Sequence, residues 1–177
     1  MAAHGKMGNV VFRKFGKEYV MAHVPIVGDH EPTPAQLAQR GVFKIAVLYG
    51  SSVVADPAKS AAYASKARER GITVFALSVA DFLHAPVVDN IDLSAYTGKT
   101  GETITIQATD DVKVAGVAVR ILNTSGAVLE QGPAVTENGT NWTYTTSSNL
   151  PVGQPVTIEV TASDLPGNKT VKTQAKS

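Results

Sequence analysis

Residues that could carry out chemistry are few and lie far apart along this sequence. The chain contains no cysteine, which excludes disulfides, thiolate metal sites and cysteine nucleophiles. Its 4 histidines include no pair at the i, i+4 spacing of a helical zinc site. No Gly-x-Ser-x-Gly motif occurs, and Ser51 and Ser52 follow Gly50 at an expected helix bend rather than at a nucleophile turn. We therefore predict that the protein is not an enzyme.

One segment imitates the end of a phosphate-binding loop. Gly98, Lys99 and Thr100 match its last three positions, but Leu93 stands where the first glycine belongs. The pattern also lacks the strand before such a loop and the helix after it. We interpret the segment as a turn between strands, and we expect no cofactor.

Acidic side chains form two short groups that could attract calcium, which takes oxygen ligands from such loops. One group lies at residues 89–92, at the junction between the predicted domains, and the other lies at residues 110–111, at a predicted strand end. Aspartate and asparagine are also the ordinary residues of turns, which is the preferred interpretation. We predict no metal site, and the alternative calcium ligands are Asp89, Asp92, Asp110 and Asp111.

Length and composition describe an ordinary folded chain. Its 177 residues allow one large domain or two small ones, and 44% hydrophobic residues permit a packed core. No run approaches the ~18 apolar residues of a membrane span, and a net charge of +1 gives no overall field to attract nucleic acid. Residues 1–87 carry 10 Lys and Arg against 6 Asp and Glu, while residues 88–177 carry 6 against 9. That division suits head-to-tail stacking of identical subunits, although scatter between two domains explains it as simply.

Residues 1–32 are expected to form a β-hairpin arm. Apolar runs at 10–12 and 19–24 flank a basic turn at Gly16, where glycine supplies positive φ. A two-stranded hairpin is marginal in water, so the arm needs a surface to lie on. Its basic and aromatic residues could follow a phosphate backbone, but a protein partner is preferred over nucleic acid. The predicted assembly residues of the arm are Val10, Phe12, Phe15, Tyr19 and Met21.

Residues 33–86 are expected to be helical. Thr33-Pro34-Ala35-Gln36 is a helix start with a capping box, and Asp56-Pro57 starts a second helix that ends at Gly71. The first helix is apolar nearly all round in its second half, which predicts burial on several sides, and Gly50 is expected to weaken or bend it. Residues 72–85 fit a helix or a strand, and the helix is favoured. Two helix residues join the predicted assembly interface: Leu37 and Phe43.

Residues 87–177 are expected to form an all-β sandwich. Seven short candidate strands are separated by turn signals, and each alternates apolar and polar residues. The candidates cover residues 88–93, 103–108, 116–122, 127–130, 141–146, 155–162 and 170–174. Trp142 and Tyr144 share a face, and Trp142 is the expected core aromatic. The fold class is therefore α+β, with an arm, a short helical hairpin and a sandwich.

The C-terminal part resembles the bacterial immunoglobulin-like modules found in adhesins and as appendages on phage virions. The resemblance is carried by Asp110-Asp111, Trp142, the alternating run Val156 to Ala162, and above all the segment 162–168, Ala-Ser-Asp-Leu-Pro-Gly-Asn. It covers about half of the chain and implies that 162–168 is the turn between the last two strands. The front half is similar to small uncharacterised bacterial and phage-associated proteins, through Thr33-Pro34-Ala35-Gln36 and Arg40 with Phe43.

These features lead to the hypothesis of a structural protein that assembles with copies of itself, and with other structural proteins as further candidates. The object would be a virion component or an extracellular filament that displays the sandwich. The first eight residues lack the apolar core of a secretory signal, so we expect a virion or bacterial cell-surface location with no signal peptide visible. The alternative is an adhesin-like module that binds carbohydrate or protein through sandwich loops. Its predicted loop residues are Asp111, Lys113, Glu137 and Asn141.

Overall fold

The structure is a computed structural model that describes residues 5–15, 18–24, 31–136, 138–150 and 154–176. The chain divides into two compact units, Met1–Ala38 and Gln39–Ser177, and the helix α1 runs across their boundary. The expected boundary between helices and sandwich, at residues 86 and 87, lies inside the second unit.

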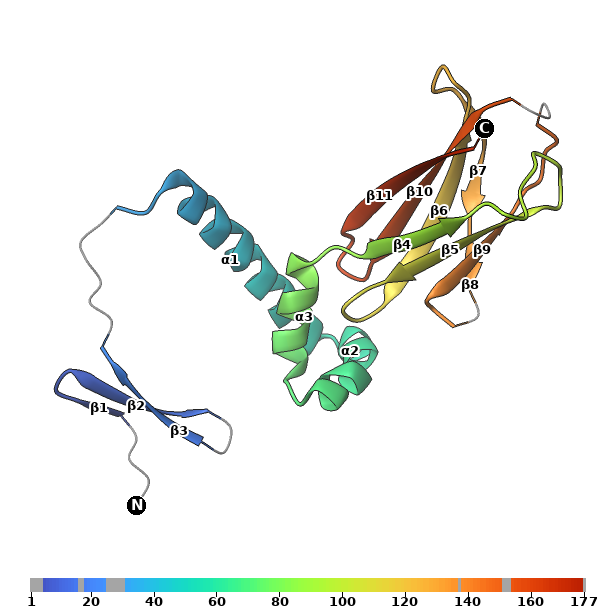
Figure 1. Ribbon diagram of the computed structural model, residues 1–177. Helices are drawn as coiled ribbons and strands as arrows, with labels where there is room; N and C mark the ends of the chain where they lie inside the picture. Colours follow the sequence, from blue (N-terminus) through green and yellow to red (C-terminus); the bar gives the residue numbers. More distant parts are fainter. Residues whose placement is uncertain (1–4, 16–17, 25–30, 137, 151–153, 177) are drawn as a thin grey trace. The chain divides into compact units, whose positions relative to one another are not determined.

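The first unit contains a three-stranded antiparallel sheet in the order β1-β2-β3 (Figure 1). Strand β2 (Val10–Phe15) pairs with β3 (Glu18–His23), as the two apolar runs predict. Strand β1 (Gly5–Met7) adds a third strand that the sequence pattern did not indicate, because three residues are too few to show alternation. The predicted turn at Gly16 lies outside the described residues.

Three helices follow: α1 (Pro34–Ala55), α2 (Pro57–Arg70) and α3 (Val74–Leu83). The capping box forms, with the Thr33 hydroxyl accepting from the Gln36 amide and the Gln36 side chain accepting from the Thr33 amide. The Asp56 carboxylate caps α2, and Gly71 ends it in the left-handed conformation that glycine adopts without strain. The ambiguous segment 72–85 contains α3 at residues 74–83, so the favoured interpretation as a short helix is confirmed.

One expectation about α1 is wrong: the helix is not buried on several sides. Its buried residues are Ala46, Gly50 and Val53, which form one narrow stripe. The helix spans Gly50 without interruption, and this glycine lies against α3, where a Cβ would come within 2.8 Å of a Val79 methyl group. The large apolar residues of its second half that are exposed are Ile45, Leu48 and Val54.

Two four-stranded antiparallel sheets form the β-rich part (Figure 1). The first has the order β4-β5-β9-β8, and the second has the order β11-β10-β6-β7. The strands of the first sheet are β4 (Val87–Asp92), β5 (Thr103–Thr109), β8 (Val135–Thr136) and β9 (Asn141–Thr145). Those of the second are β6 (Val114–Leu122), β7 (Val128–Pro133), β10 (Val156–Asp164) and β11 (Lys169–Lys176).

Alternation along these strands builds one core between the two sheets. Strand β10 is buried at every second residue, and β5 and β6 contribute in the same way. Trp142 and Tyr144 of β9 are both buried there, as predicted. The protein is thus a mixed α+β chain with a sandwich-like β part, and all seven candidate strands are present. Strand β8 is added, and its two residues are too short for a pattern.

Candidate functional site

The arm sheet has an apolar face. Strand register places Met7 opposite Val10 and Phe12 opposite Met21, so side chains from all three strands share this face. Met7 is 72% exposed and Met21 is 68% exposed, while Tyr19 lies half-exposed beside the Lys14 ammonium. Four of the predicted arm residues therefore gather on one surface: Val10, Phe12, Tyr19 and Met21. Phe15 pairs with Glu18 at the strand end, and its side chain lies outside the described part.

Helix α1 carries the second exposed apolar surface. Leu48 is 63% exposed and Ile45 is 55% exposed, although both are residues that normally contribute to cores. The exposed large apolar residues of α1 include the two predicted assembly residues and are Leu37, Val42, Phe43, Ile45, Leu48 and Val54. We call this set the α1 apolar surface.

A polar network in the interior joins the three helices to one another. The Tyr49 and Tyr63 hydroxyls lie 2.8 Å apart, and the Tyr63 hydroxyl donates to the Asp81 carboxylate at 2.6 Å. Asp81 is fully buried in α3. Burial raises the pKa of Asp81 from 3.8 to about 7; the Tyr63 hydrogen bond opposes this shift, and the nearby Asp110 and Asp164 carboxyls add to it.

The Asp81 and Asp110 carboxyls approach each other across the junction between helices and sandwich, and this proximity adds to the raised pKa of Asp81. Each has one buried oxygen, Oδ1, without a hydrogen-bond partner among the described groups. Protonation of Asp81 therefore lowers the electrostatic cost of holding α3 against the β5–β6 turn.

Asn168 is a second residue that links α3 to the sandwich. Its side-chain amide donates to the backbone carbonyls of Asp81, Phe82 and His84 at 3.2–3.3 Å, and to the Asp164 carboxylate at 2.8 Å. Asp164 in turn accepts from the backbone amides of Gly167 and Asn168, and Gly167 has a φ of 97°. The segment 162–168 thus contains the last three residues of β10 and the β10–β11 turn at residues 165–168, and Asn168 of this turn also binds the end of α3.

An exposed ion-pair network borders the same junction. Arg70 donates two hydrogen bonds to Asp111 Oδ1, and His84 Nδ1 lies 2.7 Å from Asp111 Oδ2. These partners hold the pKa of Asp111 below its ordinary value. A hollow of about 250 Å³ beside them is lined by His84, Ala85, Val87, Thr109, Asp110 and Asp111. Of the two predicted binding loops, this one is therefore engaged with the helices, although Lys113 is exposed.

The acidic candidates serve turns and pairs in this structure. Asp89 accepts from the Thr109 hydroxyl, Asp92 accepts from the Ser94 amide, and Asp110 Oδ2 accepts from the amides of residues 112 and 113. Across the described ranges, no three His, Asp or Glu side chains converge in a way that could hold a metal ion. Within the same ranges, no helix is long and apolar enough to span a membrane.

In the segment that resembles the end of a phosphate-binding loop, a carboxylate of the same chain accepts the backbone hydrogen bonds. Glu102 accepts from the backbone amides of Thr97, Gly98 and Lys99 at 2.6–3.0 Å. The Thr97 hydroxyl and these amides lower the pKa of Glu102 to about 2. An anion binding here would have to displace a carboxylate that is already ionised, so the segment serves as a turn.

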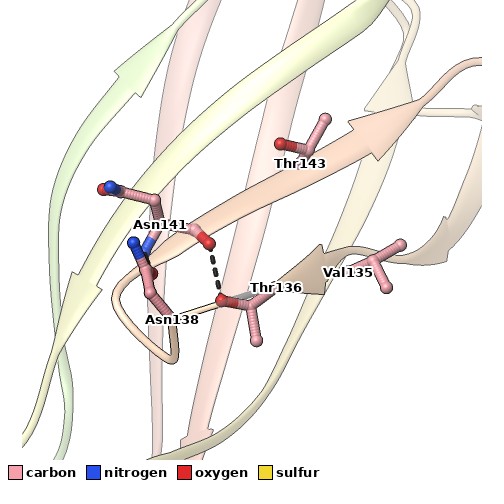
Figure 2. Close-up of a pocket in the computed structure, with 5 residues that line it drawn as sticks. All are labelled: Val135, Thr136, Asn138, Asn141 and Thr143. Carbon is pink, nitrogen blue, oxygen red and sulfur yellow. Dashed lines mark hydrogen bonds between the residues drawn. The ribbon is translucent and has the colours of Figure 1, made fainter.

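The loop between β8 and β9 borders the second predicted binding region (Figure 2). An open hollow of about 380 Å³ is lined by Val135, Thr136, Asn138, Asn141 and Thr143. Figure 2 shows the Thr136 hydroxyl donating to the Asn141 carbonyl, at 2.6 Å. Asn138 accepts from two loop amides, so its carbonyl oxygen is already used. Glu137 lies outside the described residues.

Sequence reasoning missed the buried network of Tyr49, Tyr63, Asp81 and Asn168. One signal could have indicated it, since Asp81 is the only charged residue of the apolar segment 72–83. A single acid in such a helix is either exposed or paired. Its partners came from residues 18 to 87 positions away, which no local pattern reveals.

Comparisons with known proteins give little further guidance. No protein-family model matches the chain, and no curated protein matches it. Among solved structures, an engineered protein has a TM-score of 0.39 and 20% identity over 51% of this chain, which covers 19% of that protein. CopC from Methylosinus trichosporium OB3b has a TM-score of 0.38 and 14% identity, covering 52% of this chain and 90% of CopC. Likenesses at this level carry no argument about function.

Proposed function

We propose that this chain is a non-enzymatic structural protein that self-assembles through its N-terminal arm and α1. The object would be a virion component or an extracellular filament. One observation carries the proposal: of the 17 exposed large apolar residues in the described part of the chain, 10 belong to the arm sheet or to α1. Concentrations of exposed apolar residues mark interaction surfaces in soluble proteins.

The α1 apolar surface is suited to a second helix. The helix has 22 residues, which corresponds to a length of about 33 Å. Its exposed apolar residues occur on several sides rather than on one stripe, so more than one neighbour can pack on it. Such multiple contacts are what a ring, sheet or filament requires of each subunit.

The sandwich would be the displayed part. Its buried apolar residues form one core, and its resemblance to immunoglobulin-like modules is part of this proposal. The basic front and the acidic back add attraction between successive subunits in a head-to-tail arrangement.

Deletion of residues 1–24 tests the proposal. The full chain should form particles larger than 18.5 kDa by light scattering and regular objects by negative-stain microscopy. The deleted chain should be a smaller species with an intact sandwich, reported by the fluorescence of the single tryptophan, Trp142. A monomeric full-length chain at high concentration would overturn the proposal.

A matched pair of substitutions isolates the α1 apolar surface. Ile45 and Val171 are both 55% exposed, but Val171 lies on the outer face of β11. Ile45→Lys should reduce assembly, because it places a charge where a neighbour packs. Val171→Lys should leave assembly unchanged, and equal effects of both would count against an interface on α1.

The second candidate function is a binding module for carbohydrate or protein. It is favoured by the open hollow at the β8–β9 loop, whose amide and hydroxyl groups suit polar ligands (Figure 2). A glycan array read with the full chain and with the deleted chain separates the two functions. A binding module keeps its ligand after residues 1–24 are removed, whereas an assembly protein loses its particles.

A further inference from the structure

Strand β3 is an edge strand of the sheet β1-β2-β3, and the backbone groups that point away from this sheet can be identified. Val24 donates to the Asn9 carbonyl at 2.8 Å, which makes residues 9 and 24 a hydrogen-bonded pair of the β2–β3 ladder. Because such pairs alternate in an antiparallel ladder, Glu18, Val20 and Ala22 turn their backbone groups toward β2. The backbone groups of the other three residues of β3 point away from the sheet, and these residues are Tyr19, Met21 and His23. In the described part of the chain, no strand pairs with this edge.

The edges of the sandwich are protected, and the edge of β3 is not. Strand β11 carries lysines, and Lys172 and Lys176 donate to carbonyls of residues 88, 89 and 93 at the neighbouring sheet. The ladders of β4 and of β7 have register shifts, and β8 has two residues. These are the usual means by which proteins block pairing at an edge. Strand β3 has six residues, without lysine, proline or register shift.

We propose that β3 pairs with β3 of a second copy, antiparallel, with Met21 opposite Met21 on a two-fold axis. This inference rests on the proposed function and names the contact within it. In a β3–β3 ladder, each hydrogen-bonded pair must consist of one outward-pointing residue from each copy. This requirement restricts the possible registers between the two strands. Centring on Met21 matches all the outward residues of the strand, whereas a shift to Val20 leaves His23 without a partner within the strand.

The side chains suit this register. Tyr19 lies opposite His23 of the second copy, and Val20 lies opposite Ala22 of the second copy, so no like charges face each other. Met21 sits between the two tyrosines on the apolar face, where sulfur–aromatic contacts are favourable. The apolar faces of the two arm sheets become continuous, and the joined sheet offers a larger surface to further subunits. A two-fold contact of this kind uses the same strand twice and needs no second site.

Cysteine cross-linking tests the register in full-length protein, because the natural chain has no thiol. Oxidised Met21→Cys should give a disulfide-linked dimer, since facing Cα atoms of a hydrogen-bonded pair are about 5.5 Å apart. A mixture of Val20→Cys and Ala22→Cys chains should cross-link as the mixed dimer and far less as either chain alone. A Val20 dimer forming alone would overturn the register.

The substitution Met21→Pro tests pairing at the β3 edge without introducing a thiol. The Met21 amide points away from β2, so Met21→Pro leaves the ladder of the arm intact. It should weaken dimerisation about tenfold or more, because two pairing amides are lost per dimer. Met21→Ala, which keeps the amide, should weaken it less. Equal dimerisation of the proline and alanine variants would overturn the pairing.

These outcomes separate this inference from the proposed function. Particles that form normally without the Met21 cross-link and without sensitivity to Met21→Pro would overturn the β3 pairing and leave self-assembly standing. Absence of any particle larger than a monomer in the unsubstituted chain would overturn both.

Discussion

The arm with α1 and the sandwich use the same kinds of residue in opposite ways. In the sandwich, alternating strands of two sheets cover each other, so Ile104, Ile158 and Val160 are fully buried. In the arm and α1, residues such as Met21 and Leu48 are mostly exposed. The difference is whether an apolar face finds its complement within the same chain. A face that does so contributes to folding, and a face that does not is available for association.

The largest loss in the free energy of unfolding should come from truncating a side chain in the sandwich core. Ile158→Ala should lower the free energy of unfolding by about 4 kcal/mol, because it removes buried methyl groups and leaves a cavity. Met21→Ala should change it by less than about 0.5 kcal/mol, because the side chain is exposed. Urea titration followed by Trp142 fluorescence measures both. Similar losses for the two variants would contradict the comparison.

An effect of similar size on the free energy of unfolding should appear in the pH dependence of the junction between helices and sandwich. Unfolded chains release the Asp81 proton near pH 3.8 and the folded chain near pH 7, so the folded state binds more protons between these values. The contribution of Asp81 is therefore full below about pH 4 and is lost by about pH 7, a change of about 4 kcal/mol at about 1.36 kcal/mol per pKa unit.

Asp81→Asn should remove the decrease in the free energy of unfolding between pH 4 and pH 7. The asparagine amide cannot ionise, but it can still form a hydrogen bond with Tyr63. Asp92→Asn is the control, since Asp92 is exposed and its pKa is lowered by the Ser94 amide. Thermal unfolding from pH 4 to pH 8 makes the measurement. An unchanged slope in Asp81→Asn would show that another group titrates in this range.

Two glycines of α1 should respond with opposite signs. Gly50→Ala should lower the free energy of unfolding by about 1–2 kcal/mol, because the new methyl group meets the stiff side chain of Val79. Gly41→Ala should raise it by up to about 1 kcal/mol, because its space is open and alanine favours helix. Circular dichroism during heating distinguishes them. Stabilisation by both would mean that α1 and α3 are not in contact at Gly50.

The smallest effect should come from a partly exposed pair on the sandwich. Arg120 of β6 and Glu159 of β10 form an ion pair across neighbouring strands, with 2.6 Å between Arg120 Nη1 and Glu159 Oε1. Glu159→Gln should cost about 0.5 kcal/mol and less at high salt, because surface pairs are screened. A loss comparable to that of Ile158→Ala would show that polar contacts, rather than apolar burial, hold the sandwich together.

Local signals in the sequence predicted most of the elements. The helix caps at Thr33 and Asp56 and the alternation of the long strands are local properties, and the structure confirms them. The short strands β1 and β8 were missed because two or three residues cannot show a period. The register between strands, which spacing along one strand does not fix, brings the arm residues Val10, Phe12, Tyr19 and Met21 to one face.

The sequence by itself determined where helices and strands form, because capping, turn chemistry and side-chain alternation act within a few residues. Only the tertiary structure decided which apolar faces are covered, that α1 continues through Gly50, and that Asp81 meets Asp110 and Asn168. Those outcomes depend on contacts between residues far apart in the chain. Whether an apolar face is buried depends on the element that packs against it. The residue pattern of one helix or strand does not predict which element that will be.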